Sequence, residues 1–388
     1  MGEVVSVWDN VVGQDQVVQR LKKVACADAS KIAQSWLICG SAGFGSVQVA
    51  RAFAAALESA DHGEDQNGDL SKTAKEVLAG SHPDIHTLAT EGVTLSVDSV
   101  REIIGISEQM PSTAPWRIII IEDIGRMLER STNVLLKEIE EPSEHTIWLL
   151  CASNSQDVLP TIRSRTQLVQ LATPDEKSIA EYVEEKTNVD AKIANRVARL
   201  CQGNVETALL YANDEFALNL RDELLAGIFR MHDAGDAVML AAMLIEDAKS
   251  QAENEVQRNV ESQQQEFRRI NGLAESDRIP AKLRTAYNVI GKKDEVKRKV
   301  TRLTRDVLGR SLDAISSVYR DILVVINNAQ SSSPIINQEY QSDIVSLAKN
   351  LTASRALNCV NSISAARRRL AGNGNPTLVF EALFCSFL

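Results

Sequence analysis

The chain has 388 residues, enough for two or three domains, and its 44% hydrophobic and 24% charged residues are ordinary for a globular protein. The formal net charge of -10 excludes a general basic nucleic-acid binder, so any contact with DNA is expected to be local or indirect. No apolar run has the length of a membrane span, no signal-peptide pattern opens the chain, and the six scattered cysteines include no C-x-x-C pair. We therefore expect a cytoplasmic protein with reduced thiols and no membrane contact.

Strands and helices are predicted to alternate along the first 172 residues. Short apolar runs predict strands at 35–39, 85–88, 118–121, 146–152 and 167–171, with helices between them. The strand at 118–121 is a run of isoleucines, which is typical of a parallel strand buried on both faces. The alternation predicts a doubly wound α/β domain, in which ligands bind beyond the carboxyl ends of the strands.

A glycine-rich loop follows the first of these strands. It reads GSAGFGSV over residues 40–47, with glycines at Gly40, Gly43 and Gly45. Its context of strand, loop and helix is that of a phosphate-binding loop, G-x-x-x-x-G-K-[S/T], but Ser46 replaces the Lys and Val47 replaces the Ser or Thr. Losing the Lys and the Mg²⁺ ligand is expected to weaken nucleotide binding about 10²–10⁴-fold, and hydrolysis further. The loop alone fits a glycine-rich turn without a phosphate ligand equally well.

Polar side chains follow two other strands of this domain. Glu122 and Asp123 end the isoleucine strand, and Ser153 and Asn154 follow the next strand. In a parallel sheet the ends of neighbouring strands meet at one edge, so these side chains are expected near the glycine loop.

Beyond Thr173-Pro174 no further strand is expected, and the chain from about residue 215 to its end is predicted to be helical. Residues 246–306 are rich in Gln, Glu, Arg and Lys, with sparse apolar positions at helical spacing. This pattern predicts two long antiparallel helices joined near 272–280. We interpret them as a solvated helical hairpin rather than a binding surface.

Six motifs, in the family's order, resemble the clamp-loader branch of the AAA+ family, as in the bacterial DNA polymerase III clamp loader. They are VVGQ at 11–14, the glycine loop at 40–47, GSHPD at 80–84, VDSVR at 97–101, 118–123 together with NVLLKEIEEP at 133–142, and TIRSRT at 161–166. The resemblance implies an AAA+ P-loop domain at 1–173 and a small helical lid domain at 174–214. It further implies an all-α collar, or oligomerisation, domain at 215–388, in which 246–306 looks like an insertion.

Several positions depart from the family's pattern. The family's Walker B strand ends in Asp followed by Glu, whereas here Glu122 precedes Asp123. Glu206 stands where the family's sensor 2 arginine contacts the γ-phosphate, and residues 58–80 lack the four zinc-binding cysteines of many relatives. With Ser46 and Val47, these departures imply a degenerate nucleotide site. ATP and Mg²⁺ are expected to bind weakly or not at all, and no zinc or other metal is expected.

One functional position of the family is retained. Ser164-Arg165 matches the family's S-R-C motif, with Thr166 in place of Cys. In the family this arginine reaches the ATP of the neighbouring subunit, so the resemblance implies that Arg165 is an arginine finger acting in trans. Taken alone, the residue also fits an exposed loop arginine. Asn154, in the sensor 1 neighbourhood, and the 82–84 turn are interpreted as structural.

The resemblance implies a non-hydrolysing stator without ATPase activity of its own. Its expected partners are the ATPase subunits (gamma/tau), the delta subunit and the sliding clamp, in a hetero-oligomer expected to be a pentamer. That assembly would load the clamp onto primed DNA, which this chain meets only indirectly. One alternative is an active gamma/tau-type motor, against which Ser46, Val47 and Glu206 count. Another is a helical adaptor outside replication, against which Ser164-Arg165 counts.

Overall fold

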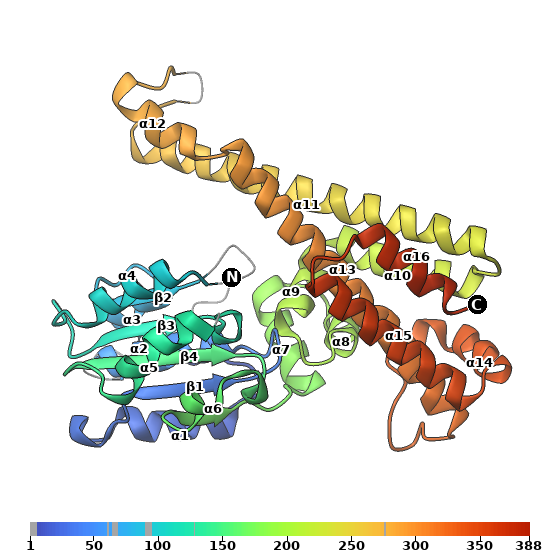
Figure 1. The fold of residues 1–388 in the computed structure, drawn as a ribbon, viewed down its shortest axis with the longest axis horizontal. Helices are drawn as coiled ribbons and strands as arrows, with labels where there is room; N and C mark the ends of the chain where they lie inside the picture. The colour runs from blue at the N-terminus through green and yellow to red at the C-terminus, as the bar shows by residue number, and fades with distance from the viewer. Residues whose placement is uncertain (1–5, 60–61, 64–68, 90–94, 128, 275–276) are drawn as a thin grey trace. The chain divides into compact units, whose positions relative to one another are not determined.

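The structure is a computed structural model, and it describes residues 6–59, 62–63, 69–89, 95–127, 129–274 and 277–388. The chain forms two compact units, Met1–Asn213 and Asp214–Leu388. Figure 1 shows the elements of both units, and each unit is described here by itself.

A five-stranded parallel sheet forms the centre of the first unit. Its strands are β1 Ser35–Cys39, β2 Ile85–Leu88, β3 Arg117–Ile121, β4 Thr146–Ala152 and β5 Gln167–Gln170. They lie in the order β2-β3-β4-β1-β5, and every neighbouring pair is parallel. All five strands expected from the sequence are therefore confirmed. Because the strands are parallel, their carboxyl ends share one edge of the sheet.

Helices cover both faces of this sheet (Figure 1). They are α1 Asp15–Ala25, α2 Ser46–Glu58, α3 Lys72–Leu78, α4 Val97–Ser107, α5 Glu129–Glu140 and α6 Pro160–Arg163, with short 3-10 turns η1 Ala29–Lys31, η2 Ile124–Arg126 and η3 Ser155–Asp157. The isoleucines of β3 alternate between the two faces, since Ile118 and Ile120 pack with α1 and α2, whereas Ile119 and Ile121 pack with α4 and α5. The predicted doubly wound α/β fold is thus confirmed.

Three short helices complete the first unit: α7 Glu176–Thr187, α8 Ala191–Leu200 and α9 Val205–Asn213. The side chain of the residue before α7 or α8 accepts a hydrogen bond from the first turn, as Asp175 does from Ser178 N and Asp190 from Ile193 N. Such caps satisfy amide groups that a helix leaves unpaired at its start. Among the described residues no strand follows Gln170, as the sequence predicts.

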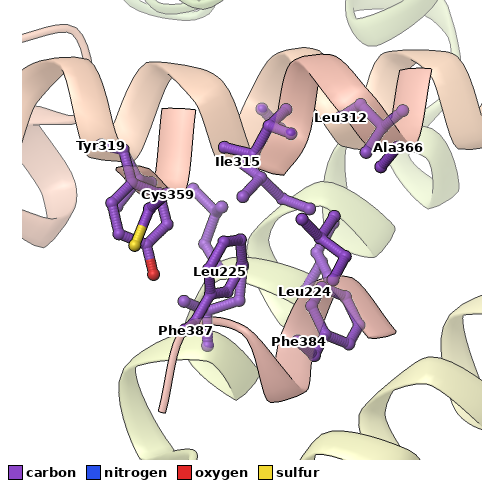
Figure 2. Packing of buried hydrophobic residues seen from close by; sticks show 14 of the residues in the cluster. Leu224, Leu225, Leu312, Ile315, Tyr319, Cys359, Ala366, Phe384 and Phe387 are labelled. Atoms are coloured by element: carbon purple, nitrogen blue, oxygen red, sulfur yellow. The ribbon is translucent and has the colours of Figure 1, made fainter. Parts of the chain in front are cut away.

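The second unit is all-helical. It contains α10 Glu215–Arg230, α11 Ala234–Ile270, α12 Ala281–Val289, α13 Lys293–Ile326, η4 Gln338–Tyr340, α14 Gln341–Asn350, α15 Ala353–Ala371 and α16 Pro376–Cys385. Figure 2 shows its core, where Leu224 and Leu225 of α10 meet Ile315 of α13 and the C-terminal Phe384 and Phe387. None of the described helices is long and apolar enough to cross a membrane.

The long hairpin of the second unit differs in one respect from the sequence prediction. The spacing predicts one helix running from Leu283 through Ile290 into the second limb, but the chain breaks between α12 and α13. Gly291 lies in the left-handed region at φ +81°, and Lys292 is the N-cap of α13. Glycine adopts this conformation without the steric cost that other residues incur, so it ends α12 despite the continuous apolar period.

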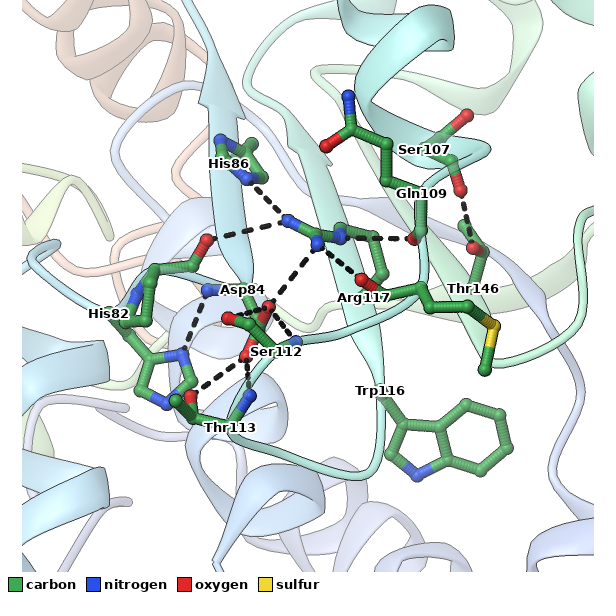
Figure 3. A network of polar contacts seen from close by, with 12 residues as sticks. His82, Asp84, His86, Ser107, Gln109, Ser112, Thr113, Trp116, Arg117 and Thr146 are labelled. Atoms are coloured by element: carbon green, nitrogen blue, oxygen red, sulfur yellow. Dashed lines mark hydrogen bonds and ion pairs between the residues drawn. The ribbon is translucent and has the colours of Figure 1, made fainter.

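The turn before β2 is held by a buried polar network (Figure 3). The Asp84 carboxylate is fully buried and accepts hydrogen bonds of 2.7–2.9 Å from the amides and hydroxyls of Ser112 and Thr113. Arg117 Nη2 lies 3.3 Å from Asp84 Oδ1. Burial alone would raise the pKa of Asp84, but the hydrogen bonds from Ser112 and Thr113 outweigh it and hold the pKa well below its usual range. The 82–84 turn therefore orders the sheet edge.

Beside this network lies an unusual carboxyl group at the end of α2. Glu58 is 4% exposed, its Oε2 accepts a 3.3 Å hydrogen bond from Trp116 N, and its Oε1 has no hydrogen-bond partner among the described residues. Burial raises the pKa of Glu58 from 4.5 to about 8. The folded chain therefore holds this group protonated at neutral pH.

This carboxyl group predicts a pH dependence of stability. Between about pH 5 and pH 8 the folded chain keeps the Glu58 proton, whereas the unfolded chain releases it. Raising the pH over this range should therefore lower the free energy of unfolding by about 2–4 kcal/mol. Glu58→Gln removes this cost, and its free energy of unfolding in urea should exceed that of the wild type increasingly as the pH rises. Glu102→Gln, an exposed change on α4, should keep the wild-type slope. Equal slopes for Glu58→Gln and the wild type would contradict the buried, protonated state.

Candidate functional site

The strand order places the polar side chains and the glycine loop at one edge of the sheet. β4 lies between β1 and β3, so the segments after these three strands are neighbours. Gly40 N donates a 3.1 Å hydrogen bond to Ala152 O, and the Cys151 thiol lies 3.6 Å from Ser46 O. Burial raises the pKa of the Cys151 thiol well above its usual range, so this sulfur is no nucleophile at neutral pH.

The glycine loop has the backbone of a strand-to-helix turn. Gly43 and Gly45 have φ values of +80° and +89°, and Gly45 is the N-cap of α2. Ser46 is the first residue of the helix, and the half-buried Val47 packs against the core between α2 and the sheet. The position that would offer a hydroxyl to Mg²⁺ therefore holds an apolar side chain engaged in packing.

The N-terminus of α9 closes directly onto this loop. Val205 N donates a 3.0 Å hydrogen bond to Gly43 O. The Asn204 side chain lies over the Gly43 Cα: a Cβ added at Gly43 would lie 2.1 Å from Asn204 Oδ1. This side chain is itself fixed, because its Oδ1 caps α9 by accepting a 2.9 Å hydrogen bond from Thr207 N. The loop and the small helical part of the first unit are thus in direct backbone and side-chain contact.

A carboxylate lies at the start of α9. Glu206 is in the first turn of the helix, where a negative charge is favoured by the helix dipole. Gln48 Nε2 of α2 lies 3.4 Å from Glu206 Oε1, so the Glu206 carboxylate lies close to the first turn of α2. A negative charge there opposes the approach of a polyphosphate to the helix that follows the glycine loop.

The two acidic residues after β3 have different partners. Glu122 forms an ion pair with Arg51 of α2, with 3.2 Å between Oε1 and Nη2. Asp123 Oδ1 accepts a 3.1 Å hydrogen bond from Gly125 N and caps η2. Asn154, after β4, acts in the same way on η3, because its Oδ1 accepts a 3.0 Å hydrogen bond from Gln156 N. Asp123 and Asn154 therefore each have a local structural role as the cap of a short 3-10 turn.

Arg165 comes directly after Ser164, the C-cap residue of α6, and is far from the glycine loop in the sequence. Its guanidinium forms a 3.1 Å ion pair with Glu140 of α5 and donates to Thr161 O at 3.2 Å. A longer contact of 3.4 Å joins it to Ser164 Oγ, which itself donates to Thr161 O. The Arg165 side chain is 37% exposed and that of Glu140 is 54% exposed. The guanidinium is therefore held at the surface by contacts within its own chain.

Three residues that contribute to this region were not predicted from the sequence. Arg51 pairs with a site acid, Asn204 covers the loop, and Glu140 holds Arg165. A signal existed for Arg51, which interrupts the alanine-rich apolar run of α2. Asn204 and Glu140 carry no such signal, because their partners are distant in sequence.

The described residues contain no group of three His, Cys, Asp or Glu side chains able to hold a metal ion. Residues 60–61 and 64–68, part of the 58–80 segment in which many relatives carry zinc-binding cysteines, lie outside the described part of the chain. The expectation that no zinc is bound therefore stays a prediction.

Two family models match this sequence. The model of DNA polymerase III, delta subunit, matches residues 13–175, and that of DNA polymerase III, delta subunit, C terminal, matches residues 299–387. Together they cover more than half of the chain, and residues 176–298 lie between them.

Individual relatives match shorter segments. DNA polymerase III subunit delta' of Haemophilus influenzae is 35% identical over 113 residues, 29% of this chain and 35% of that protein. Subunit delta' of Escherichia coli is 30% identical over 169 residues, 43% of this chain and 50% of that protein. DNA polymerase III subunit gamma of Buchnera aphidicola is 25% identical over 223 residues, 54% of this chain and 58% of that protein. The matches to the two delta' proteins span half or less of their length.

The contact between loop and α9 predicts unequal costs for two glycine substitutions. Gly43→Ala and Gly45→Ala both place a Cβ at positive φ, but only the first meets Asn204, since the nearest atom to a Cβ at Gly45 lies 3.8 Å away. Gly43→Ala should lower the free energy of unfolding by at least about 1 kcal/mol more than Gly45→Ala. In a double-mutant cycle, Asn204→Ala should remove this excess. Equal costs at the two glycines would show that the loop is not packed against α9.

Proposed function

We propose that this chain, which belongs to the delta-prime branch of the DNA polymerase III clamp-loader family, is a non-hydrolysing subunit of a clamp loader. In this proposal it assembles with gamma/tau-type ATPase subunits and a delta subunit to load a sliding clamp onto primed DNA. It binds no ATP itself and contributes Arg165 to the ATP site of a neighbouring subunit. No other cofactor is required.

The observation that carries the proposal is the state of the chain's own glycine loop. The Gly43 carbonyl is bonded to α9, Val47 is packed, and Glu206 lies beside the start of α2. A nucleotide at this loop would lie beside the Glu206 carboxylate, without a Lys to neutralise its phosphates. Charged hydrogen bonds of this kind are worth about 1.5–3 kcal/mol each, so their loss removes most of the affinity of a P-loop.

The contacts of Arg165 support a role outside its own chain. An exposed ion pair such as Arg165–Glu140 is worth about 0–1 kcal/mol, so exchanging Glu140 for a phosphate costs little. The gain is larger, because a guanidinium placed on a transferring phosphoryl group raises the rate by about 10³–10⁵. In this proposal Glu140 holds the Arg165 side chain at the surface until a stronger anion replaces it. The planar guanidinium of Arg165 can bind that anion through two N–H groups, which a lysine cannot do.

An active motor of the gamma/tau type is the second candidate. The similarity to the Buchnera gamma subunit favours it, since that match spans more residues than the two delta' matches. Against it stand three separate positions at the phosphates, Ser46, Val47 and Glu206. Restoring one of them alone leaves the other two, so we favour the non-hydrolysing subunit.

The trans role of Arg165 predicts a separation between folding and activity. In a reconstituted clamp loader, Arg165→Ala should leave assembly and thermal stability unchanged but lower DNA-stimulated ATP hydrolysis and clamp loading by at least about tenfold. The loss arises because the neighbouring ATP site lacks the charge that stabilises the transferring phosphoryl group.

Two matched variants serve as controls. Arg163→Ala removes an exposed arginine of the same short helix, one that donates to Ser155 O. Glu140→Gln removes only the intramolecular partner of Arg165. Both should load clamps within about twofold of the wild type, because the finger itself remains. Unchanged rates for Arg165→Ala, or an equal loss in Arg163→Ala, would overturn the assignment.

A further inference from the structure

The hairpin of the second unit carries a concentrated positive charge in an acidic chain. Residues 278–305, named here the basic arm, contain ten Lys or Arg and two acidic residues, a net charge of +8 against -10 for the whole chain. The arm comprises α12 and the first turns of α13, and Figure 1 shows α12 at the far end of the hairpin that α11 and α13 form. A charge excess of this size on one extension is the electrostatic pattern of a polyanion-binding surface.

Most of these basic side chains are available for an external anion. Seven of the ten are exposed and form no ion pair with a described carboxylate: Arg278, Lys282, Arg284, Lys292, Lys293, Lys297 and Arg298. Some acidic residues of the hairpin have basic partners on their own helix, as in Glu266–Arg269 of α11 and Glu295–Lys299 of α13. The excess charge of the arm is therefore not neutralised by these pairs.

The helix fixes the spacing of these charges. Residues 293–305 of α13 span roughly 18 Å at 1.5 Å per residue. Duplex DNA carries about one phosphate charge per 1.7 Å of its axis, so a rod of this length faces several phosphates at once. The apolar positions Val307 and Leu308 of the same helix are buried in the core of the second unit. The same helix thus packs with one side and carries charge on the rest of its surface.

The composition of the arm favours a phosphate backbone over a protein surface or single-stranded bases. Protein interfaces have apolar or aromatic anchors at their centre, whereas the exposed residues of the arm are mainly Lys, Arg, Thr and Asn. Single-strand binding depends on aromatic rings that stack on bases. The aromatic ring of the arm, Tyr287, is already engaged: it packs edge-on against Phe267 and is covered by the Arg268 guanidinium.

We propose that the basic arm binds the sugar-phosphate backbone of duplex DNA without reading its sequence. Lys282 on α12 and Lys292, Lys293, Lys297 and Arg298 at the start of α13 make the contacts. Because the rest of the chain is acidic, binding is confined to the arm and weakens steeply with salt. The site goes beyond the family role proposed above and does not depend on Arg165. It also replaces the interpretation of 246–306 as a solvated hairpin alone.

The test is a titration of a fluorescently labelled duplex of about 30 base pairs with the full-length chain at about 50–200 mM salt. The arm variant changes Lys282, Lys292, Lys293 and Lys297 to Gln. Its affinity should fall at least tenfold at about 100 mM salt, and the dependence of log K on log salt should flatten by about 0.9 for each lost contact. An unlabelled duplex of different sequence should compete as well as the same sequence.

The matched control changes four exposed lysines of the first unit, Lys22, Lys72, Lys177 and Lys192, to Gln, with the same change in net charge. It should bind within about twofold of the wild type. Any of four results would overturn the proposal: no binding by the wild type at low salt, an equal loss in both variants, tighter binding of a single strand, or displacement by polyglutamate at equal charge.

A fifth result would point to a protein partner instead. If the arm variant bound duplex normally but lost association with clamp-loader subunits, the arm would be a docking surface for an acidic protein. The test of DNA binding by the arm does not depend on the proposed role of Arg165, because Arg165→Ala should bind duplex as tightly as the wild type.

Discussion

The hydrogen bond from Val205 N to Gly43 O, at 3.0 Å, fixes the glycine loop of the first unit against the small helices that follow the sheet. It joins the loop after β1 to the first turn of α9, and the Asn204 side chain fills the space over Gly43. This bond uses a carbonyl oxygen of the loop, whereas phosphates bind backbone N–H groups, so it packs α9 against the loop without occupying phosphate-binding donors. Glu206 adds a negative charge beside the same helix start. The loop therefore serves as a structural joint between the sheet and the small helices.

Two arginines of the first unit, Arg51 and Arg165, pair with different carboxylates. Arg51 of α2 forms a 3.2 Å ion pair with Glu122, the acid that follows β3. Arg165 follows α6 and forms an exposed pair with Glu140, which a stronger anion could replace at little cost. Within the proposed assembly the chain would thus give a positive charge to a neighbour while using none of its own for ATP.

The sequence predicts the sheet well because its strands are short, apolar and bounded by polar turns. The isoleucines at 118–121 are typical of a strand buried on both faces, and β4 at Thr146–Ala152 has the bounds expected. The error at Gly291 has a local cause: one backbone conformation outweighs a continuous apolar period. The contacts of Asn204 and Glu140 were beyond reach because they join residues far apart in the chain.

The central claim is that this chain completes a nucleotide site in another subunit and has none of its own. The most direct measurement is a calorimetric titration of the purified full-length chain with ATP and Mg²⁺. The account predicts no heat of binding up to about 1 mM nucleotide, where an intact P-loop would be saturated. Saturable binding with a micromolar dissociation constant would contradict it. The chain would then be a nucleotide-regulated subunit.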